Sequence, residues 1–258
     1  MTELTSQHGR RGRPGRAPAA RAWRPAVQLP GAALLAAGLA LGAWLQNPRP
    51  AGALDLGILK ALIPLRTAGL EAFYKLVEFW DGPQATPWII AVVSLLIALR
   101  GHRAAGLVFG VMTGLSWLPG HVAKDLFPRD RPPAVTQPVW EVTGANSFPS
   151  GHTGLVVAAA VAAFLVMTCL GHRKGRWWLL GGLLAWAVVV GWSRMATSVH
   201  FPSDVLGGAL LDGGMAASTL YQIFGVIMLL GALCVIALHR TFKGESEAMM
   251  ESVPAAAH

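Results

Sequence analysis

A short polar stretch lies between two long apolar segments and holds residues that can act on an anion. Arg194 is followed six positions later by His200, and Asp204 comes four positions after the histidine. An arginine can bind an anion, a histidine can act as a nucleophile or a base, and an aspartate can fix the imidazole tautomer. Pro202 favours the first turn of a helix, which would bring Asp204 close to His200. Taken alone, the same pattern is typical of a polar loop that caps a membrane helix.

Two further polar stretches add groups that suit a phosphate. Lys124 and Arg131 supply charged donors, and an arginine has a planar fork that can bind two oxygens at once. Ser150 and Gly151 precede a run that we expect to be helical from about His152. Their backbone N–H groups and the serine hydroxyl would then form an anion cradle at a helix N-terminus.

The two histidines of these stretches differ in their surroundings. His200 has a carboxylate partner in Asp204 and suits in-line attack on phosphorus. His152 has no acidic partner nearby in sequence, and it suits protonating the leaving oxygen and then activating water. This division predicts a phosphohistidine intermediate, with cations stabilising the equatorial oxygens. The sequence shows no Cys/His or carboxylate cluster that would predict a metal site.

The composition of the chain is typical of a membrane protein. Its 258 residues are 53% hydrophobic and 13% charged, whereas a soluble domain carries about 25% charged residues. Apolar runs near membrane-spanning length therefore predict one integral membrane domain. Cys169 and Cys234 both lie within such runs, which favours small buried side chains over a disulfide.

The apolar runs predict an all-α, polytopic membrane helix bundle with a six-helix core. The runs cover residues 26–48, 82–99, 104–123, 152–171 and 177–191, and a sixth starts at Val205. Between residues 54 and 80, charges recur at helical intervals among apolar residues. This pattern predicts an interfacial amphipathic helix, broken near Pro64, which we interpret as a packed connector without chemistry.

The C-terminal part leaves two arrangements open. Ser203 to His239 is 37 residues, or about 55 Å of helix, against a hydrocarbon core of about 30 Å. A break at residues 212–214 or 221–222 would allow a seventh span through Cys234, which we favour. One kinked, projecting helix would instead leave the basic residues after His239 in the cytoplasm.

The basic segments predict how the bundle is oriented. Six arginines fall within the first 24 residues, which indicates a cytoplasmic arm better than a nucleic-acid site. Span parity then puts the basic turns at residues 100–103 and 173–176 inside as well. The same parity puts the three polar stretches on the outer face. Cations are unfavoured on that face, and snorkelling explains only one or two of them. An anionic partner would explain the whole set: Lys124, Arg129, Arg131 and Arg194.

The three polar stretches together resemble the type 2 phosphatidic acid phosphatase family. They read Lys124-x6-Arg131-Pro132, then Pro149-Ser150-Gly151-His152, then Ser193-Arg194-x5-His200-x3-Asp204. All three signature motifs are present in order and with the family's internal spacings, and the resemblance covers about residues 54–220. It implies a six-helix core that hydrolyses a lipid phosphate or diphosphate.

The resemblance also implies roles for individual residues. It implies that His152 is the acid and that His200 with Asp204 is the nucleophile pair. The phosphate would be bound by Lys124, Arg131, Ser150, Gly151 and Arg194. We therefore expect a disordered basic cytoplasmic arm over residues 1–24, a membrane phosphatase domain over 25–240 and a flexible tail over 241–258.

The expected activity is metal-independent and cofactor-free hydrolysis at the outer face of a bacterial-type plasma membrane. Undecaprenyl diphosphate is the leading substrate. Phosphatidic acid, phosphatidylglycerophosphate and a phosphorylated glycolipid present phosphate at the same depth and remain alternatives. We expect membrane lipids as partners and no nucleic acid, and the sequence leaves the oligomeric state open.

Two other classes of function compete with this one. Vanadium-dependent haloperoxidases have a similar pocket because vanadate mimics phosphate, but they are soluble, unlike a chain with six predicted spans. An anion channel or transporter would need polar residues through the middle of several spans. Asp212 is the one charged candidate in such a position, so we rank this class last.

Overall fold

Helices make up the regular structure of the chain wherever it is described. The computed structural model describes residues 25–46, 48–140 and 146–218, together with residues 234 and 239. Within these ranges the only β-type pairing is an isolated bridge between Asp130 and Asn146. The elements in order are α2 (Pro25–Leu45), α3 (Pro48–Leu62), η1 (Ile63–Leu65), α4 (Ala68–Asp81), α5 (Thr86–Leu99), α6 (Arg103–Leu115), α7 (Trp117–Leu126), η2 (Ala134–Thr136), α8 (Gly151–Cys169), α9 (Gly175–Ala196) and a helix over residues 202–218.

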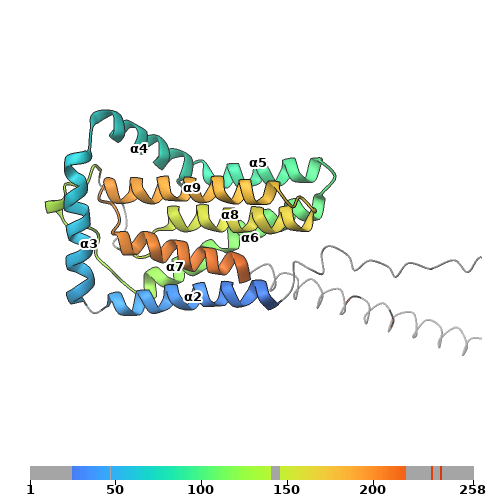
Figure 1. Cartoon of the computed structure of the whole chain (residues 1–258), viewed down its shortest axis with the longest axis horizontal. Helices are drawn as coiled ribbons and strands as arrows, with labels where there is room; N and C mark the ends of the chain where they lie inside the picture. Colours follow the sequence, from blue (N-terminus) through green and yellow to red (C-terminus); the bar gives the residue numbers. More distant parts are fainter. Residues whose placement is uncertain (1–24, 47, 141–145, 219–233, 235–238, 240–258) are drawn as a thin grey trace, which may run out of the picture.

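Helix α8 is the centre of the bundle and packs against α6, α7 and α9 (Figure 1). Small side chains line it, and Ala158, Ala160 and Ala162 are fully buried. Small residues let neighbouring helices approach closely, which is how helices gain packing energy where lipid removes the hydrophobic drive to associate. The polar loops at its two ends are thereby held on a close-packed bundle.

Helix α2 packs against the helix at residues 202–218 through glycines. A Cβ added to Gly31 would lie 2.8 Å from the Ala217 side chain, and one added to Gly38 would lie 2.7 Å from that of Leu211. On the last helix, a Cβ added to Gly214 would lie 2.6 Å from the backbone nitrogen of Leu35 in α2. The glycines therefore serve close helix packing.

This packing corrects one expectation about the C-terminal part. The helix runs without interruption from residue 202 to residue 218, so the predicted break at residues 212–214 is wrong. Gly213 and Gly214 stand where neighbouring helices leave no room for a side chain, and they do not mark a turn. The alternative break at residues 221–222 and the seventh span lie outside the described residues.

The prediction of an all-α membrane bundle is confirmed. Residues 103–126, α8 and α9 are each long and apolar enough to cross a membrane, and α4 with α5 forms a further pair bent by 56°. Helix α2 is apolar over Leu29–Leu45 but shorter. The third predicted span is interrupted at Ser116, because Pro119 has no N–H to donate to the preceding turn. The sixth span stays a prediction beyond residue 218.

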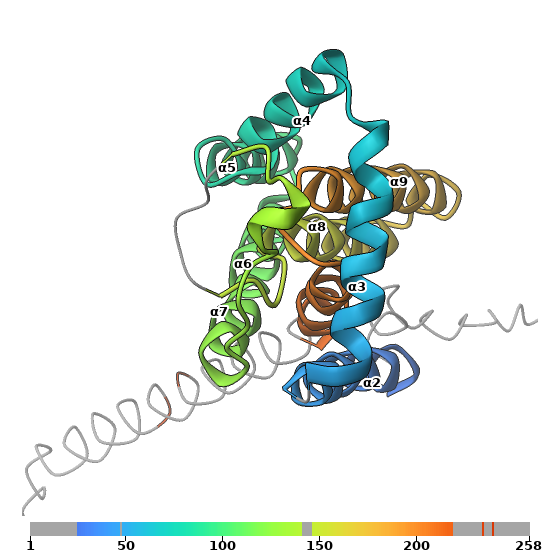
Figure 2. The ribbon, with the colours of Figure 1, turned by 90° about the vertical axis from the view of Figure 1, so that its left-hand side faces the viewer.

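Helix α3 lies across one end of the bundle, and α4 slopes back from it towards α5 (Figures 1 and 2). The break predicted near Pro64 is present as η1, and Thr67 then caps α4 by accepting a hydrogen bond from Leu70 N at 3.3 Å. The links from α5 to α6 and from α8 to α9, which hold the basic turns, lie at the opposite end (Figure 1). The bundle thus has one basic end and one end crossed by α3.

Candidate active site

The three polar stretches meet at the end of the bundle that α3 crosses, and hydrogen bonds join them directly. Lys124 Nζ donates to the carbonyl of Pro149 at 2.9 Å, which ties the end of α7 to the start of α8. Arg131 Nη1 donates to the carbonyl of Val199 at 2.8 Å, beside His200. Three segments that are distant in the sequence therefore share one site.

Helix α8 and the last helix approach each other closely beneath this site. Ser150 N donates to the carbonyl of Asp204 at 2.9 Å, so the expectation that this N–H forms part of an anion cradle is wrong. A Cβ added to Gly208 would lie 2.1 Å from the carbonyl oxygen of Ser150, which as backbone cannot move aside. Glycine at position 208 is thus required for the start of α8, with Ser150 and Gly151, to lie beside Asp204.

His200 and Asp204 are placed as the sequence predicts. After α9 the chain turns back through Ser198, whose φ of 53° is left-handed, and the last helix begins at residue 202. His200 Nδ1 then lies 3.6 Å from Asp204 Oδ2, which also accepts a hydrogen bond from Phe201 N at 2.8 Å. With Nδ1 turned to the carboxylate, the lone pair of Nε2 is left for another partner.

His200 is held as a neutral base. Its side chain is almost fully buried, and this burial lowers the pKa of His200 to about 4, with Arg131 and Lys124 adding to the effect and Asp204 opposing it. A histidine in water has a pKa near 6.5. At neutral pH the imidazole therefore carries no proton on the nitrogen that faces away from Asp204.

The structure adds a buried ionic network that sequence reasoning missed. Arg129 donates from Nη1 to Asp204 Oδ1 and from Nη2 to Asp55 Oδ2, both at 2.7 Å. Ser203 joins the network through its backbone N–H, which donates to Asp55 Oδ1 at 3.1 Å. The guanidinium also lies over the ring of Phe201 at 4.2 Å. Arg129 was expected on this face as a cation, but the pattern carried no sign that it would join α3 to Asp204.

The connector was interpreted as a segment without chemistry, and the structure corrects this. Asp55 of α3 enters the network above, and Glu78 of α4 reaches the site itself. Glu78 Oε2 pairs with Arg194 Nη1, and its Oε1 lies 3.5 Å from His152 Nε2. His152, which lacks an acidic partner nearby in sequence, therefore gains one from a distant helix. The amphipathic pattern placed Glu78 on a polar helix face but could not show what that face contacts.

Several buried donors at the site have no hydrogen-bond partner among the described residues. Besides His200 Nδ1, which faces Asp204 at 3.6 Å, they include Arg194 Nε, Arg194 Nη2 and His152 Nε2. A buried donor without a partner costs roughly 1–3 kcal/mol, more when it is charged. An anion with several oxygens would satisfy these groups. The donor set is cationic, so it suits an anion and not a metal ion.

Known proteins resemble this chain in sequence and in fold. The sequence pattern of the PAP2 superfamily matches residues 105–228, which include all three polar stretches. The provisionally named undecaprenyl-diphosphatase YbjG of Escherichia coli (strain K12) is 34% identical over 145 residues, which are 53% of this chain and 67% of that protein. The chain belongs to the PAP2 superfamily. As a PAP2 member it is a lipid phosphatase of the membrane, which confirms the family and enzyme class expected from the sequence.

Two further relatives agree with this assignment. An undecaprenyl-diphosphatase of Sulfolobus acidocaldarius is 30% identical over 126 residues, which are 47% of this chain and 57% of that protein. The crystal structure of a transmembrane PAP2-type phosphatidylglycerolphosphate phosphatase from Bacillus subtilis matches with a TM-score of 0.64 at 25% identity. That match covers 76% of this chain and 95% of the other.

We predict that His200 stays neutral well below pH 6. In protein labelled with 15N-histidine, the ring signals of His200, assigned with His200→Asn, should titrate near pH 4, while a histidine in water titrates near 6.5. Since the folded pKa lies below the unfolded one, the contribution of neutral His200 to stability is fully present above about pH 6.5 and is lost as the pH falls towards 4. Titration of the His200 signals at or above pH 6.5 would contradict the buried, neutral state.

Proposed function

We propose that the protein hydrolyses a lipid phosphate or diphosphate without a metal, through a phosphohistidine at His200. The observation that carries this proposal is the pairing of a neutral, buried His200 with Asp204 beside the cations that face it. A nucleophile must be unprotonated at the attacking atom, and burial provides that state here. Asp204 would stabilise the positive charge that forms on the imidazole as it bonds to phosphorus.

The first half of the reaction forms a P–N bond and breaks a P–O bond. His200 Nε2 attacks phosphorus in line with the oxygen that leads to the lipid. The electron pair of the breaking P–O bond goes to the leaving oxygen, which takes a proton from His152. The oxygens that stay on phosphorus carry the developing charge. They would be held by Lys124, Arg131, Arg194, the hydroxyl of Ser150 and the N–H group of Gly151.

The second half releases inorganic phosphate. His152, now unprotonated, removes a proton from a water molecule as that water attacks phosphorus. The P–N bond breaks, its electron pair returns to His200 Nε2, and His152 is again protonated for the next cycle. Every group assigned to the phosphate is a cation, a hydroxyl or a backbone N–H, so we expect turnover to continue in EDTA.

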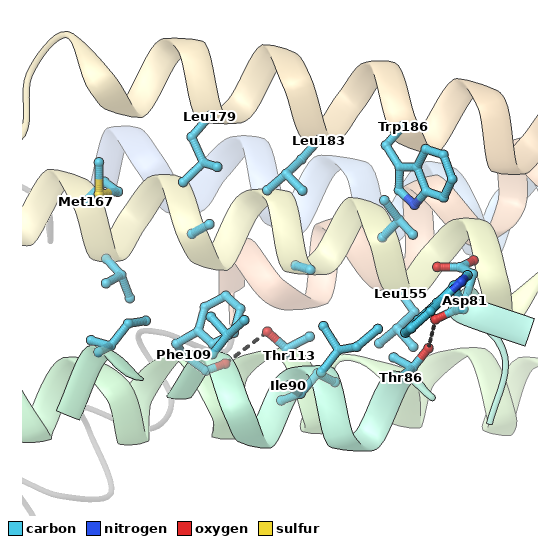
Figure 3. A pocket seen from close by; sticks show the side chains of 18 of the residues that line it. Asp81, Thr86, Ile90, Phe109, Thr113, Leu155, Met167, Leu179, Leu183 and Trp186 are labelled. Carbon is cyan, nitrogen blue, oxygen red and sulfur yellow. Dashed lines mark hydrogen bonds between the residues drawn. The ribbon is translucent and has the colours of Figure 1, made fainter. Parts of the chain in front are cut away.

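An apolar cavity supports a substrate with a long hydrocarbon chain. It encloses about 580 Å³ between α5, α6, α8 and α9 (Figure 3). From Leu155 to Met167 its lining follows α8 for about 18 Å at ~1.5 Å per residue. Asp81 and Thr86 lie at one end and Met167 at the other (Figure 3). Leu155 of the lining follows His152 by three residues on α8, so the polar end adjoins the site.

Undecaprenyl diphosphate is the substrate that we propose. Two relatives carry undecaprenyl-diphosphatase names, and the cavity offers an apolar surface to a prenyl chain. The Bacillus subtilis phosphatidylglycerolphosphate phosphatase, similar in structure, makes phosphatidylglycerophosphate the second candidate. Phosphatidic acid and a phosphorylated glycolipid have the same phosphate chemistry and belong in the same assay.

We also propose that the site faces the periplasm or the cell exterior, with the N-terminus in the cytoplasm. The basic links of α5–α6 and α8–α9 lie at the end of the bundle away from α3, and basic loops favour the cytoplasm (Figure 1). The opposite end, where the three polar stretches meet, would then lie on the outer face.

The substrate proposal is tested by a panel of the four lipids with purified full-length protein in detergent. We expect the highest kcat/KM with undecaprenyl diphosphate. Ala159→Phe, which fills the middle of the cavity, should lower this value at least tenfold and leave p-nitrophenyl phosphate hydrolysis within twofold. The matched control is Ala185→Phe on the exposed, lipid-facing surface of α9, which should change neither. Equal loss on both substrates in Ala159→Phe, with the control intact, would refute a chain-binding role for the cavity.

The mechanism predicts different defects for the two histidines. His200→Ala should abolish turnover and leave no phosphoenzyme. His152→Ala should lose most activity with lipid leaving groups and less with p-nitrophenyl phosphate, whose leaving group needs little protonation. Asp204→Asn should lower turnover by roughly 10²–10⁴, by analogy with general-base and triad variants. Rapid quench with 32P-labelled substrate measures the phosphoenzyme, and label found on His152 in place of His200 would reverse the assignment.

The orientation predicts which cysteines a membrane-impermeant thiol reagent reaches in intact cells. In a chain with Cys169 and Cys234 replaced by serine, a cysteine at Val135 should be labelled, because this exposed position lies in η2 on the side of the site. A cysteine at Lys174, in the exposed basic turn, should be labelled only after the cells are opened. The opposite pattern would place the site in the cytoplasm.

A further inference from the structure

Glu78 occupies the centre of the candidate site in the unliganded protein. One carboxylate oxygen pairs with Arg194 Nη1, and the other lies 3.5 Å from His152 Nε2. Arg194 is only 2% exposed, so its charge is enclosed by protein and Glu78 is its partner among the described ion pairs. A carboxylate from α4 thus neutralises a cation that phosphate would otherwise bind.

The two contacts of Glu78 match two contacts expected of the substrate. Under the proposed reaction, a phosphate oxygen binds Arg194 and the leaving oxygen receives its proton from His152. The two oxygens of Glu78 touch these same two side chains. Its carboxylate therefore stands where two oxygens of the substrate must lie.

A carboxylate and a phosphate cannot share this place. Like charges at contact distance repel strongly in a partly buried site, where water screens them poorly. The Glu78 side chain is 33% exposed, so it has access to water when it leaves Arg194. Its helix is also bounded by non-helical residues, at 66–67 and at 82–85, where the backbone can adjust.

We propose that Glu78 is a positioning residue that competes with phosphate for Arg194 and His152. This inference rests on the proposed function of the site. Substrate binding displaces the carboxylate, and the carboxylate returns when inorganic phosphate leaves. Glu78 thereby weakens the hold of the enzyme on free phosphate, its own product, and limits product inhibition.

The experiment measures anion binding directly, with activity as a second readout. Inorganic phosphate and orthovanadate are titrated calorimetrically into the detergent-purified full chain, as wild type, Glu78→Gln and Glu71→Gln. Glutamine keeps the shape of the side chain and removes the charge, so Glu78→Gln should bind both anions at least tenfold more tightly. Glu71 carries the same charge on the same helix, about 10 Å away along its axis. Its variant should stay within twofold of wild type.

A third variant separates an effect of the Glu78 charge from a general change in folding. Glu78→Asp keeps the charge and shortens the side chain by one methylene, so its affinity should fall between those of wild type and Glu78→Gln. The phosphate inhibition constant for lipid hydrolysis should fall in Glu78→Gln by the same factor as the dissociation constant. Unchanged or weaker binding in both Glu78 variants overturns the inference even if the wild type hydrolyses lipid phosphates. Tighter binding in a protein that hydrolyses none would support the inference and refute the proposed function.

Discussion

The geometry of the site depends on one largely buried guanidinium that lies between two carboxylates. Arg129 binds Asp204 and Asp55 at once, and these residues come from the last helix and from α3. Removing one partner of such a buried ionic contact costs roughly 3–5 kcal/mol, because the remaining charge is left uncompensated. The network therefore stabilises a single position of the Asp204 carboxylate. That position sets which nitrogen of His200 faces away from it, and this is the atom that attacks phosphorus in the proposed reaction.

Packing within the bundle provides the frame for this network. Lipid supplies little hydrophobic drive for helices to associate. Van der Waals packing between small residues at close contact therefore holds the helices together. Alanines along α8 and glycines of α2 and the last helix provide it. Gly208 serves the same end beside Ser150, where a methyl group would push the start of α8 away from Asp204. Residues with no chemistry of their own thus determine the spacing of those that have it.

The sequence predicts the parts of the site whose information is local, and it misses the long-range parts. The four-residue step from His200 to Asp204, the helix start expected near His152 and found at Gly151, and the break at Pro64 all follow from spacing and turn preference. The partners of Arg129 lie 74 and 75 residues away, and Glu78 lies 116 residues from Arg194. No periodicity encodes such pairs. The break considered at residues 212–214 was wrong for a related reason. The glycines there allow neighbouring helices to pack closely, and they do not end the helix.

The position of α3 has a consequence for how the enzyme would sense its surroundings. This amphipathic helix crosses the end of the bundle, and its Asp55 is bonded to Arg129 and Ser203 (Figure 2). In the proposed orientation, α3 lies at the depth where lipid headgroups meet water. Headgroup charge, lateral pressure and bilayer thickness all act on a helix at that depth. A displacement of α3 passes through two charged contacts to Asp204. We therefore expect the turnover rate to depend on the lipid composition of the bilayer and to differ between detergent and membranes.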